Sequence, residues 1–244
     1  MARFVLVHGA FTGGWIWEPL AKKLRAAGHT VETFDLPGLG ADQTPPHDVT
    51  LDLCVQRLID VLAARPEPAI VAANSMGGII ATQGAALAPA RVAALVYVTA
   101  FIPTHGQSLL DLTKLPEGAT DQVQANVVIE PPVGIMPREA SRMALYAECT
   151  DADAEWAIAQ QRPQPLAPFA TPVSILEGAL EGIPRFYVLC TRDRAIPEAL
   201  QRRMIREHGC EMVVELDTDH TPHLSRTREV ADAMLEFAER LAPV

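Results

Sequence analysis

Cysteines are few in this 244-residue sequence, and long apolar runs are missing from it. Its cysteines, Cys54, Cys149, Cys190 and Cys210, lie far apart and form neither a CxxC pair nor the spacing of a zinc site. We therefore expect reduced, mostly buried thiols and a cytoplasmic protein. No apolar run reaches the roughly 18 residues that a bilayer-spanning helix needs, so no such helix is expected.

Basic residues are also scarce: 20 lysines and arginines face 30 aspartates and glutamates, so the formal net charge is -10. Such a chain is a poor general binder of polyanions, which argues against a nucleic-acid partner. A secretory signal is not expected, because Met1–Arg3 runs straight into an apolar strand pattern at Phe4–Val7. With 49% hydrophobic residues, the chain can bury a sizeable core in one or two domains.

Short β-branched runs alternate with longer alanine- and leucine-rich stretches of helical period. The predicted strands are Arg3–Val7, Thr30–Phe34, Ala69–Ala73, Ala93–Val98, Arg185–Leu189 and Met212–Leu216. The predicted helices are Trp17–Ala27, Leu51–Ala64, Met76–Leu87, Glu198–His208 and Arg228–Leu241. Several of these strands are apolar nearly throughout, as strands covered on both faces should be. The alternation predicts an α/β protein with a doubly wound parallel sheet of about six strands.

The alternation stops between residues 103 and 184. This segment is rich in proline, contains one helical pattern at Leu145–Gln161 and shows no strand. It is too long for a plain loop, and open α/β sheets bind ligands at the carboxyl ends of their strands. We therefore expect a core, residues 1–102 and 185–244, and a cap region, residues 103–184, inserted over the active site. A disordered insertion is the alternative.

A serine between a predicted strand and a predicted helix carries the strongest chemical signal. Ser75 follows the run Ala69–Ala73 and stands in the pattern small-x-Ser-x-Gly. The turn from strand to helix is so tight that large side chains two positions either side would clash, and Ala73 and Gly77 relieve this. The helix N-terminus favours negative charge developing near the serine Oγ. We predict that Ser75 is a nucleophile; an ordinary N-cap serine is the alternative.

A nucleophilic serine needs a base and a carboxylate that orients the base. In a strand–elbow–helix protein these groups follow in the order Ser, Asp or Glu, His, each after a later strand. Asp193 follows the fifth predicted strand and His220 the sixth, so we predict them as acid and base. His223 is the competing base. Asp217 and Asp219 lie too close in sequence to His220 to be its favoured partner.

An oxyanion hole needs two backbone N–H groups aimed at the developing charge. The residue after the nucleophile, Met76, is predicted to supply one of them. The glycine-rich loop after the first strand is predicted to supply the other through Ala10, with Phe11 as the alternative. His8 in the same loop is expected to hold the loop by hydrogen bonding, and a second base is the other interpretation of this residue.

In this order, the motifs resemble those of the α/β-hydrolase superfamily, and more narrowly of the plant methylesterase and hydroxynitrile lyase family with its bacterial esterase relatives. The resemblance covers nearly the whole chain and rests on Phe4–Ala10, Gly14–Trp17, Asp35–Gly38, Ser75–Gly78, Cys190–Asp193 with Ile196-Pro197, and Asp219-His220 with Leu224-Ser225. It implies an α/β-hydrolase fold with a helical cap, the triad Ser75, Asp193 and His220, and an oxyanion hole from Ala10 and Met76. It also implies no metal and no organic cofactor, and it leaves a homodimer open.

Two departures from the family bear on the reaction. Most of its esterases have Gly-His before the serine, where this chain has Ala73-Asn74, and alanine still keeps the turn small. The family's lyases have Thr in place of Gly9 and Lys in place of Thr221, and that Lys helps stabilise departing cyanide. Both differences from the lyases favour the hydrolytic branch.

The leading hypothesis is a serine hydrolase of the carboxylesterase type that cleaves small, largely apolar carboxylic esters through an acyl-enzyme on Ser75. A hydroxynitrile lyase or another C–C bond-cleaving lyase is the first alternative, and a non-catalytic protein that binds a small ligand is the second. The expected partner is a small ester, not a membrane or nucleic acid. The residues expected to line the substrate pocket are Gly9, Phe11, Phe101, Ile102, Met143, Trp156 and Phe169.

Overall fold

A computed structural model describes residues 1–241 and shows one six-stranded sheet, with strand order β2-β1-β3-β4-β8-β9. The strands are β1 (Arg3–Val7), β2 (Thr30–Thr33), β3 (Ala69–Ser75), β4 (Val92–Ala100), β8 (Arg185–Cys190) and β9 (Met212–Leu216). Every neighbouring pair in this sheet is parallel. The predicted parallel sheet is therefore confirmed, and β3 and β4 run further at their carboxyl ends than the sequence pattern indicated.

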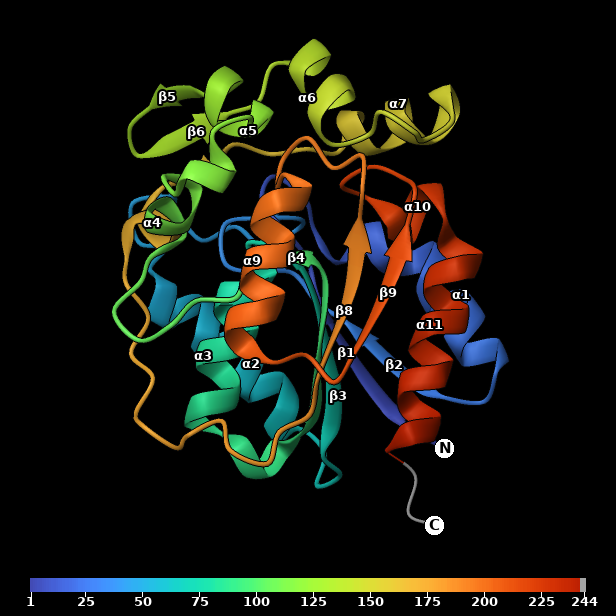
Figure 1. Cartoon of the computed structure of the whole chain (residues 1–244). Coiled ribbons are helices and arrows are strands. Elements are labelled where there is room, and N and C mark those ends of the chain that lie inside the picture. The colour runs from blue at the N-terminus through green and yellow to red at the C-terminus, as the bar shows by residue number, and fades with distance from the viewer. Residues whose placement is uncertain (242–244) are drawn as a thin grey trace.

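Helices cover both faces of the sheet (Figure 1). On one face lie α2 (Leu51–Ala63), α3 (Gly77–Leu87) and α9 (Glu198–His208), and on the other lie α1 (Glu18–Ala26) and α11 (Thr227–Arg240). These five elements confirm the predicted core helices, with ends that differ by at most one residue. The predicted helix at Met76 begins one residue later, because Met76 is the N-cap of α3.

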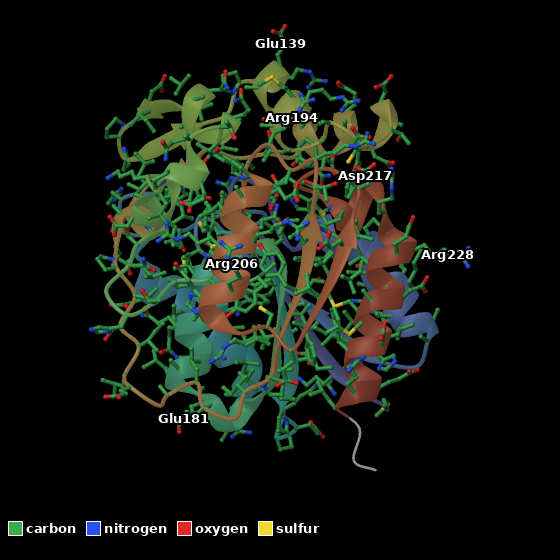
Figure 2. All side chains as sticks on the ribbon, viewed as in Figure 1. Glu139, Glu181, Arg194, Arg206, Asp217 and Arg228 are labelled. Carbon is green, nitrogen blue, oxygen red and sulfur yellow. The ribbon has the colours of Figure 1, made fainter. Side chains whose placement is uncertain are left out.

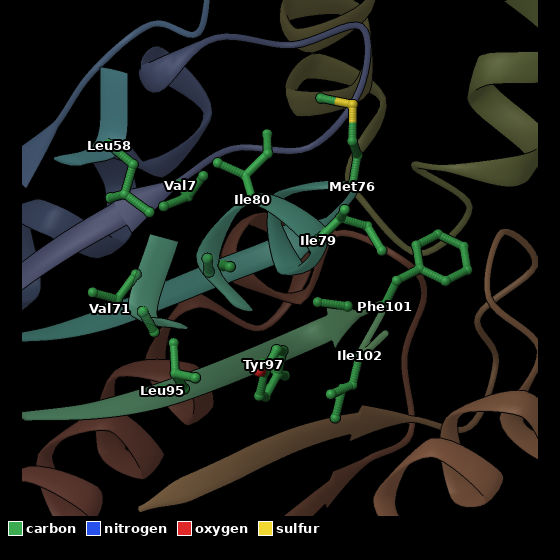
Figure 3. Packing of buried hydrophobic residues seen from close by; sticks show 14 of the residues in the cluster. Val7, Leu58, Val71, Met76, Ile79, Ile80, Leu95, Tyr97, Phe101 and Ile102 are labelled. Carbon is green, nitrogen blue, oxygen red and sulfur yellow. The ribbon is translucent and has the colours of Figure 1, made fainter. Parts of the chain in front are cut away.

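The core consists of two buried hydrophobic clusters, one on each face of the sheet. Alternate residues of β1 contribute to both clusters: Val5 and Val7 pack on one side and Phe4 and Leu6 on the other. This double burial is the physical reason why the strand is apolar at every position from Phe4 to Val7. Figure 3 shows the first cluster, in which side chains of β3, α3 and β4 interdigitate.

Several short elements complete the core. They are the 3-10 helices η1 (Gly14–Trp17) and η2 (Pro89–Arg91) and the short helix α10 (Pro222–Ser225). Charged side chains such as Glu139, Glu181 and Arg228 project from the periphery of the molecule (Figure 2). Within residues 1–241, no helix is both long enough and apolar enough to cross a bilayer. The four cysteines are free thiols; three are buried and Cys210 is half-buried.

The segment 103–184, which we call the cap segment, carries short helices and a small second sheet. Its elements are α4 (Leu109–Thr113), η3 (Pro116–Gly118), α5 (Gln122–Asn126), β5 (Val128–Glu130), β6 (Val133–Ile135), α6 (Arg138–Ala144), α7 (Asp151–Ala159), β7 (Gln164–Pro165) and α8 (Ala167–Ala170). Elements α5, α6, α7, β5 and β6 lie beyond the carboxyl ends of the core strands, at the top of Figure 1.

Two expectations for the cap segment are wrong. The helix expected at Leu145–Gln161 is confined to α7, because Leu145 ends α6 and Thr150 starts a new helix by accepting a hydrogen bond from the Asp153 N–H. The segment also contains strands, paired antiparallel as β5-β6-β7 around a turn at Pro131-Pro132. Strands of two or three residues are too short to show an alternating pattern in the sequence.

Candidate active site

The carboxyl ends of the core strands meet at a cavity of about 520 Å³. Strands β1 and β3 are neighbours, but the chain leaves β1 toward β2 and leaves β3 toward β4. The loops after β1 and β3 therefore diverge, and this divergence creates a crevice at the edge where α/β sheets bind ligands. Ala10 follows β1 and Ser75 ends β3, and both line the cavity together with His220.

Ser75 stands at the sharp turn between β3 and α3. Its φ is +54°, in the left-handed region that non-glycine residues seldom adopt. The two residues after Met76 must be glycine here. A Cβ on Gly77 would lie 2.8 Å from the backbone oxygen of His8, and one on Gly78 would lie 2.1 Å from that of Phe101. The glycines thus let α3 begin directly against the ends of β1 and β4 and leave the serine exposed to the cavity.

Backbone strain is concentrated at this site. Among residues 1–241, the non-glycine residues with positive φ are Phe11, Ser75 and Thr99, at +64°, +54° and +43°. Phe11 and Ser75 line the cavity, and the Thr99 hydroxyl donates a 3.0 Å hydrogen bond to the backbone oxygen of His220. Such strain persists only where surrounding contacts enforce it, and it clusters at functional sites.

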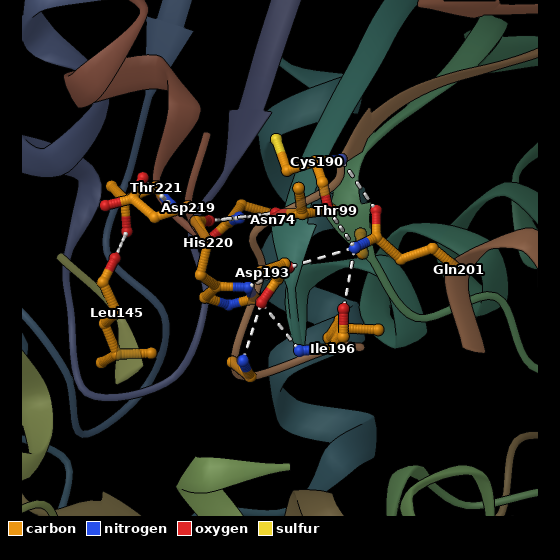
Figure 4. Close-up of polar contacts among 12 residues, drawn as sticks. Asn74, Thr99, Leu145, Cys190, Asp193, Ile196, Gln201, Asp219, His220 and Thr221 are labelled. Carbon is orange, nitrogen blue, oxygen red and sulfur yellow. Dashed lines mark hydrogen bonds and ion pairs between the residues drawn. The ribbon is translucent and has the colours of Figure 1, made fainter. Parts of the chain in front are cut away.

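The structure brings Asp193 and His220 together although they follow different strands (Figure 4). Nδ1 of His220 and Oδ2 of Asp193 are 2.8 Å apart, and both side chains are buried. The other carboxylate oxygen accepts hydrogen bonds from the backbone N–H groups of Ala195 and Ile196, at 2.7 and 2.9 Å. Gln201 adds a longer contact of 3.4 Å to Oδ2. Asp193 is therefore held by hydrogen-bond donors on all sides and presents a fixed acceptor to the imidazole.

The electrostatics of this pair favour a base. Burial alone would lower the pKa of His220, because a charged imidazolium loses its hydration. The negative charge of Asp193 and its hydrogen bond to the ring, together with the charges of Asp219 and Asp121, outweigh burial, so the pKa of His220 lies above its ordinary value. Since Nδ1 is engaged by Asp193, Nε2 is the ring nitrogen that remains for proton transfer.

Asn74 fixes the loop that carries His220. Its side-chain amide donates to the backbone oxygens of Val98 and His220, at 3.0 and 3.3 Å, and to the Thr99 hydroxyl at 3.0 Å. Asn74 thus takes a structural place at the elbow in this chain, linking the ends of β3 and β4 to the histidine backbone. These contacts explain why a polar residue is buried immediately before the serine.

Two backbone N–H groups are available beside Ser75. Within residues 1–241, neither the amide of Ala10 nor that of Met76 donates to another protein group, and both residues line the cavity. The amide of Phe11, the alternative donor, is instead bonded to Oε1 of Gln164 in the cap segment at 3.1 Å. The geometry therefore favours Ala10 and Met76 as the pair that faces a developing oxyanion.

His8 holds the loop that carries Ala10. Its ring spans from the backbone oxygen of Gly9, 2.8 Å from Nδ1, to the N–H of Leu36, 3.0 Å from Nε2. Burial lowers the pKa of His8 to about 4, so the ring is neutral near pH 7. With both nitrogens engaged in loop contacts, His8 serves as a support for the loop and not as a second base.

The competing acid and base candidates are placed differently. His223 also lines the cavity, but it is fully buried, stacks on Trp17 with ring centroids 4.1 Å apart, and has no carboxylate or other hydrogen-bond partner at either nitrogen among residues 1–241. Asp217 pairs with Arg192 at the surface. Asp219 accepts a 2.8 Å hydrogen bond from the Glu148 N–H and thereby joins the His220 loop to the cap segment.

The predicted pocket residues are divided by the structure. Phe11, Phe101 and Phe169 line the cavity. Met143 and Trp156 do not line it; Trp156 is 41% exposed and packs edge-on against Trp15.

Gly9 and Ile102 also lie outside the cavity lining. Gly9 lies behind the serine, where a Cβ would be 2.9 Å from the Ser75 Cβ.

Sequence reasoning missed two polar residues of the site. Gln201 is completely buried on α9 and forms hydrogen bonds with Cys190, Ile196 and Asp193. A polar residue on an otherwise apolar helix face could have indicated this role in the sequence. Asp121 lines the cavity from the cap segment, and no pattern in the sequence marks it. Among residues 1–241, no group of three or more His, Cys, Asp or Glu side chains is arranged to hold a metal ion.

Comparisons with known proteins indicate a hydrolase, in agreement with the geometry of the site. Residues 4–233 match the model of the alpha/beta hydrolase family. The chain is 32% identical to methylesterase 7 of Arabidopsis thaliana, over 98% of this chain and 97% of that one.

Solved structures are also similar over nearly the whole chain, and two of them illustrate this. A pyrethroid hydrolase from Sphingobium faniae shares 27% identity, with a TM-score of 0.87 over 98% of this chain and 97% of that one. A mutant of polyneuridine aldehyde esterase shares 25% identity, with a TM-score of 0.83 over 97% and 98%.

Proposed function

This chain belongs to the alpha/beta hydrolase family, and on that premise we propose that it cleaves small, largely apolar carboxylic esters through an acyl-enzyme on Ser75. The observation that carries the proposal is the 2.8 Å contact between His220 and Asp193 beside a cavity that Ser75 also lines. Relatives named as a methylesterase and as a pyrethroid hydrolase support ester cleavage.

For each step of the proposed reaction, the cavity contains a chemical group that can carry it out. His220 Nε2 takes the Ser75 proton while Asp193 orients the ring and stabilises the imidazolium. Ser75 Oγ attacks the ester carbonyl, and the N–H groups of Ala10 and Met76 stabilise the oxyanion, aided by the N-terminus of α3. His220 then protonates the leaving alcohol. A water activated by the same ring releases the acid and restores Ser75.

The cavity supports a small apolar substrate. Its volume of about 520 Å³ suits a ligand of modest size. Apolar side chains from both parts of the chain line it, among them Phe11 and Phe101 from the core and Leu145, Leu166 and Phe169 from the cap segment. We propose that residues 103–184 act as a cap that selects the substrate, while residues 1–102 and 185–241 carry the chemistry.

The lyase alternative is less well supported. Thr221 occupies the position of the lyases' lysine, and its hydroxyl donates a 2.7 Å hydrogen bond to the backbone oxygen of Leu145. A threonine at position 9 would also bring a Cβ to 2.9 Å from the Ser75 Cβ, so the glycine is required by this elbow. The absence of the lysine at position 221 and the lack of space for a threonine at position 9 both favour hydrolysis.

A series of p-nitrophenyl esters of increasing acyl length, given to the wild type and to Ser75→Ala, tests the proposal. We expect the highest kcat/KM for short or medium acyl chains, with kcat lowered by about 10⁴-fold or more in Ser75→Ala. Substantial turnover by Ser75→Ala, or a flat profile near background for both proteins, would contradict it. Release of cyanide or aldehyde from mandelonitrile would instead support the lyase.

A further inference from the structure

A carboxylate from the cap segment faces the candidate active site. Asp121 lies just before α5, and its Oδ1 accepts hydrogen bonds from the N–H groups of Val123 and Gln124, at 2.7 and 3.0 Å. The next residue, Gln122, donates its N–H to the backbone oxygen of Arg194 at 2.7 Å. This contact ties the start of α5 to the loop that carries Asp193, and Asp121 lines the same cavity as Ser75 and His220.

The second oxygen of this carboxylate has no partner. No hydrogen bond or ion pair among residues 1–241 reaches Oδ2 of Asp121, although the residue is only 7% exposed. None of the described residues that line the cavity is a lysine or an arginine. Oδ2 therefore faces a cavity whose described lining offers it no protein donor, so this oxygen is suited to a donor that arrives with a ligand.

Helix capping does not account for Oδ2. Capping uses Oδ1 alone, and asparagine would cap α5 as well as aspartate does. The charge and the free oxygen are therefore additional to the structural role of the residue.

We propose that Oδ2 of Asp121 binds a hydroxyl or ammonium group of the substrate, so that the enzyme selects esters carrying one hydrogen-bond donor on an otherwise apolar skeleton. This inference rests on the proposed function, since it names a feature of the substrate of the same site. The rest of the cavity wall, being largely apolar, offers few competing acceptors for such a donor.

The test must be made at a pH at which the carboxyl group of Asp121 is ionised. Burial raises the pKa of Asp121 to about 6, against the hydrogen bonds from Gln124 and Val123 that lower it. His220 lowers this pKa when charged, and Asp193 raises it. At pH 8 the carboxyl is ionised and acts as an acceptor only.

The test compares three ligands of similar shape: toluene, benzyl alcohol and benzylammonium. Their binding to the wild type, Asp121→Asn and Asp111→Asn is measured by titration calorimetry at pH 8. Asp121→Asn keeps the cap on α5 but replaces the acceptor with an NH₂ group. Asp111→Asn is the matched control, because Asp111 is an exposed carboxylate in the capping box of α4 and does not line the cavity.

We expect benzylammonium or benzyl alcohol to bind about tenfold more tightly than toluene to the wild type and to Asp111→Asn, and to lose this advantage in Asp121→Asn. Which of the two binds more tightly identifies the donor as a cation or a hydroxyl. Equal affinity for all three ligands, binding of none, or an equal loss for all three in Asp121→Asn would overturn the inference. Because no turnover is measured, these results are distinct from a failure of the proposed esterase activity.

Discussion

The cavity has two walls that are built in different ways: the core wall, formed by residues 1–102 and 185–241, and the cap wall, formed by the cap segment. On the core side, Ser75 ends β3 and Asp193 lies in the loop after β8 of the same sheet, and backbone N–H groups hold the carboxylate of Asp193. On the cap side, the helices α4, α5 and α8, of four or five residues each, present mainly apolar side chains. The difference teaches that the sheet fixes the positions of the proposed catalytic residues, while the surface of the cap segment can vary without disturbing them.

Replacing the acid of the core wall should have the largest effect. In Asp193→Asn, the amide cannot serve as the same acceptor for His220 Nδ1, so the imidazole loses its orientation and its charge partner. We expect kcat to fall by about 10⁴-fold. The control is Asp217→Asn, since Asp217 pairs with Arg192 at the surface and should keep wild-type activity. A tenfold or smaller loss in Asp193→Asn would show that the pair is not needed.

The pH profile of these variants gives an independent readout. His220 must be neutral to act as a base, so kcat/KM should fall as the pH drops through its raised pKa. Without the charge of Asp193, burial dominates and the pKa of His220 decreases. The residual activity of Asp193→Asn should therefore persist to lower pH than that of the wild type, and an unshifted profile would contradict this explanation.

A second substitution tests how tightly the backbone is packed at the turn after Ser75. In Gly78→Ala the new Cβ would meet the Phe101 backbone oxygen at 2.1 Å, and backbone cannot move aside. We expect a loss of about 3 kcal/mol in the free energy of unfolding, measured by urea denaturation. Gly84→Ala in the same helix is the control, because its Cβ meets the mobile end of Leu58 and should change stability by less than about 1 kcal/mol. Equal effects would show that the elbow is not especially tight.

The cap wall should respond more weakly. Phe169→Ala removes an apolar side chain from the cavity wall and should lower kcat/KM for an apolar ester by about tenfold, mainly through KM. Trp156→Ala removes a larger ring outside the cavity and should stay within about twofold of the wild type. If Trp156→Ala had the stronger effect on KM, the boundary of the cavity described above would be wrong.

The sequence predicts the core better than the cap for a physical reason. Core strands are covered on both faces, so Phe4–Val7 and similar runs are continuously apolar and their ends can be located. Asp193 follows such a strand, β8, whereas His220 follows the half-buried edge strand β9, which is apolar at every position except Glu215. Both strands could be located from the sequence, so the meeting of Asp193 and His220 at one edge of the sheet was predictable. Gln201 supports Asp193 from a helix face. In the sequence, only the polarity of Gln201 at a position expected to be buried indicated this role.

The cap segment gives no such periodic signal. Its short helices are started by single residues such as Thr150 and Asp121, and its strands have two or three residues. The break at Thr150 therefore could not be distinguished from a continuous helix across Leu145–Gln161. Whether Trp156 faces the cavity or the solvent depends on tertiary packing against Trp15, which composition alone does not reveal.

Covalent labelling of the nucleophile tests the central claim most directly. The protein is treated with diethyl p-nitrophenyl phosphate, digested and analysed by peptide mass spectrometry, with Ser75→Ala in parallel. We predict one diethylphosphoryl group, located on Ser75, together with loss of esterase activity in the same proportion, and no label on Ser75→Ala. An inactivated protein labelled at another residue, or an active esterase whose Ser75 stays unlabelled, would contradict an acyl-enzyme at this serine.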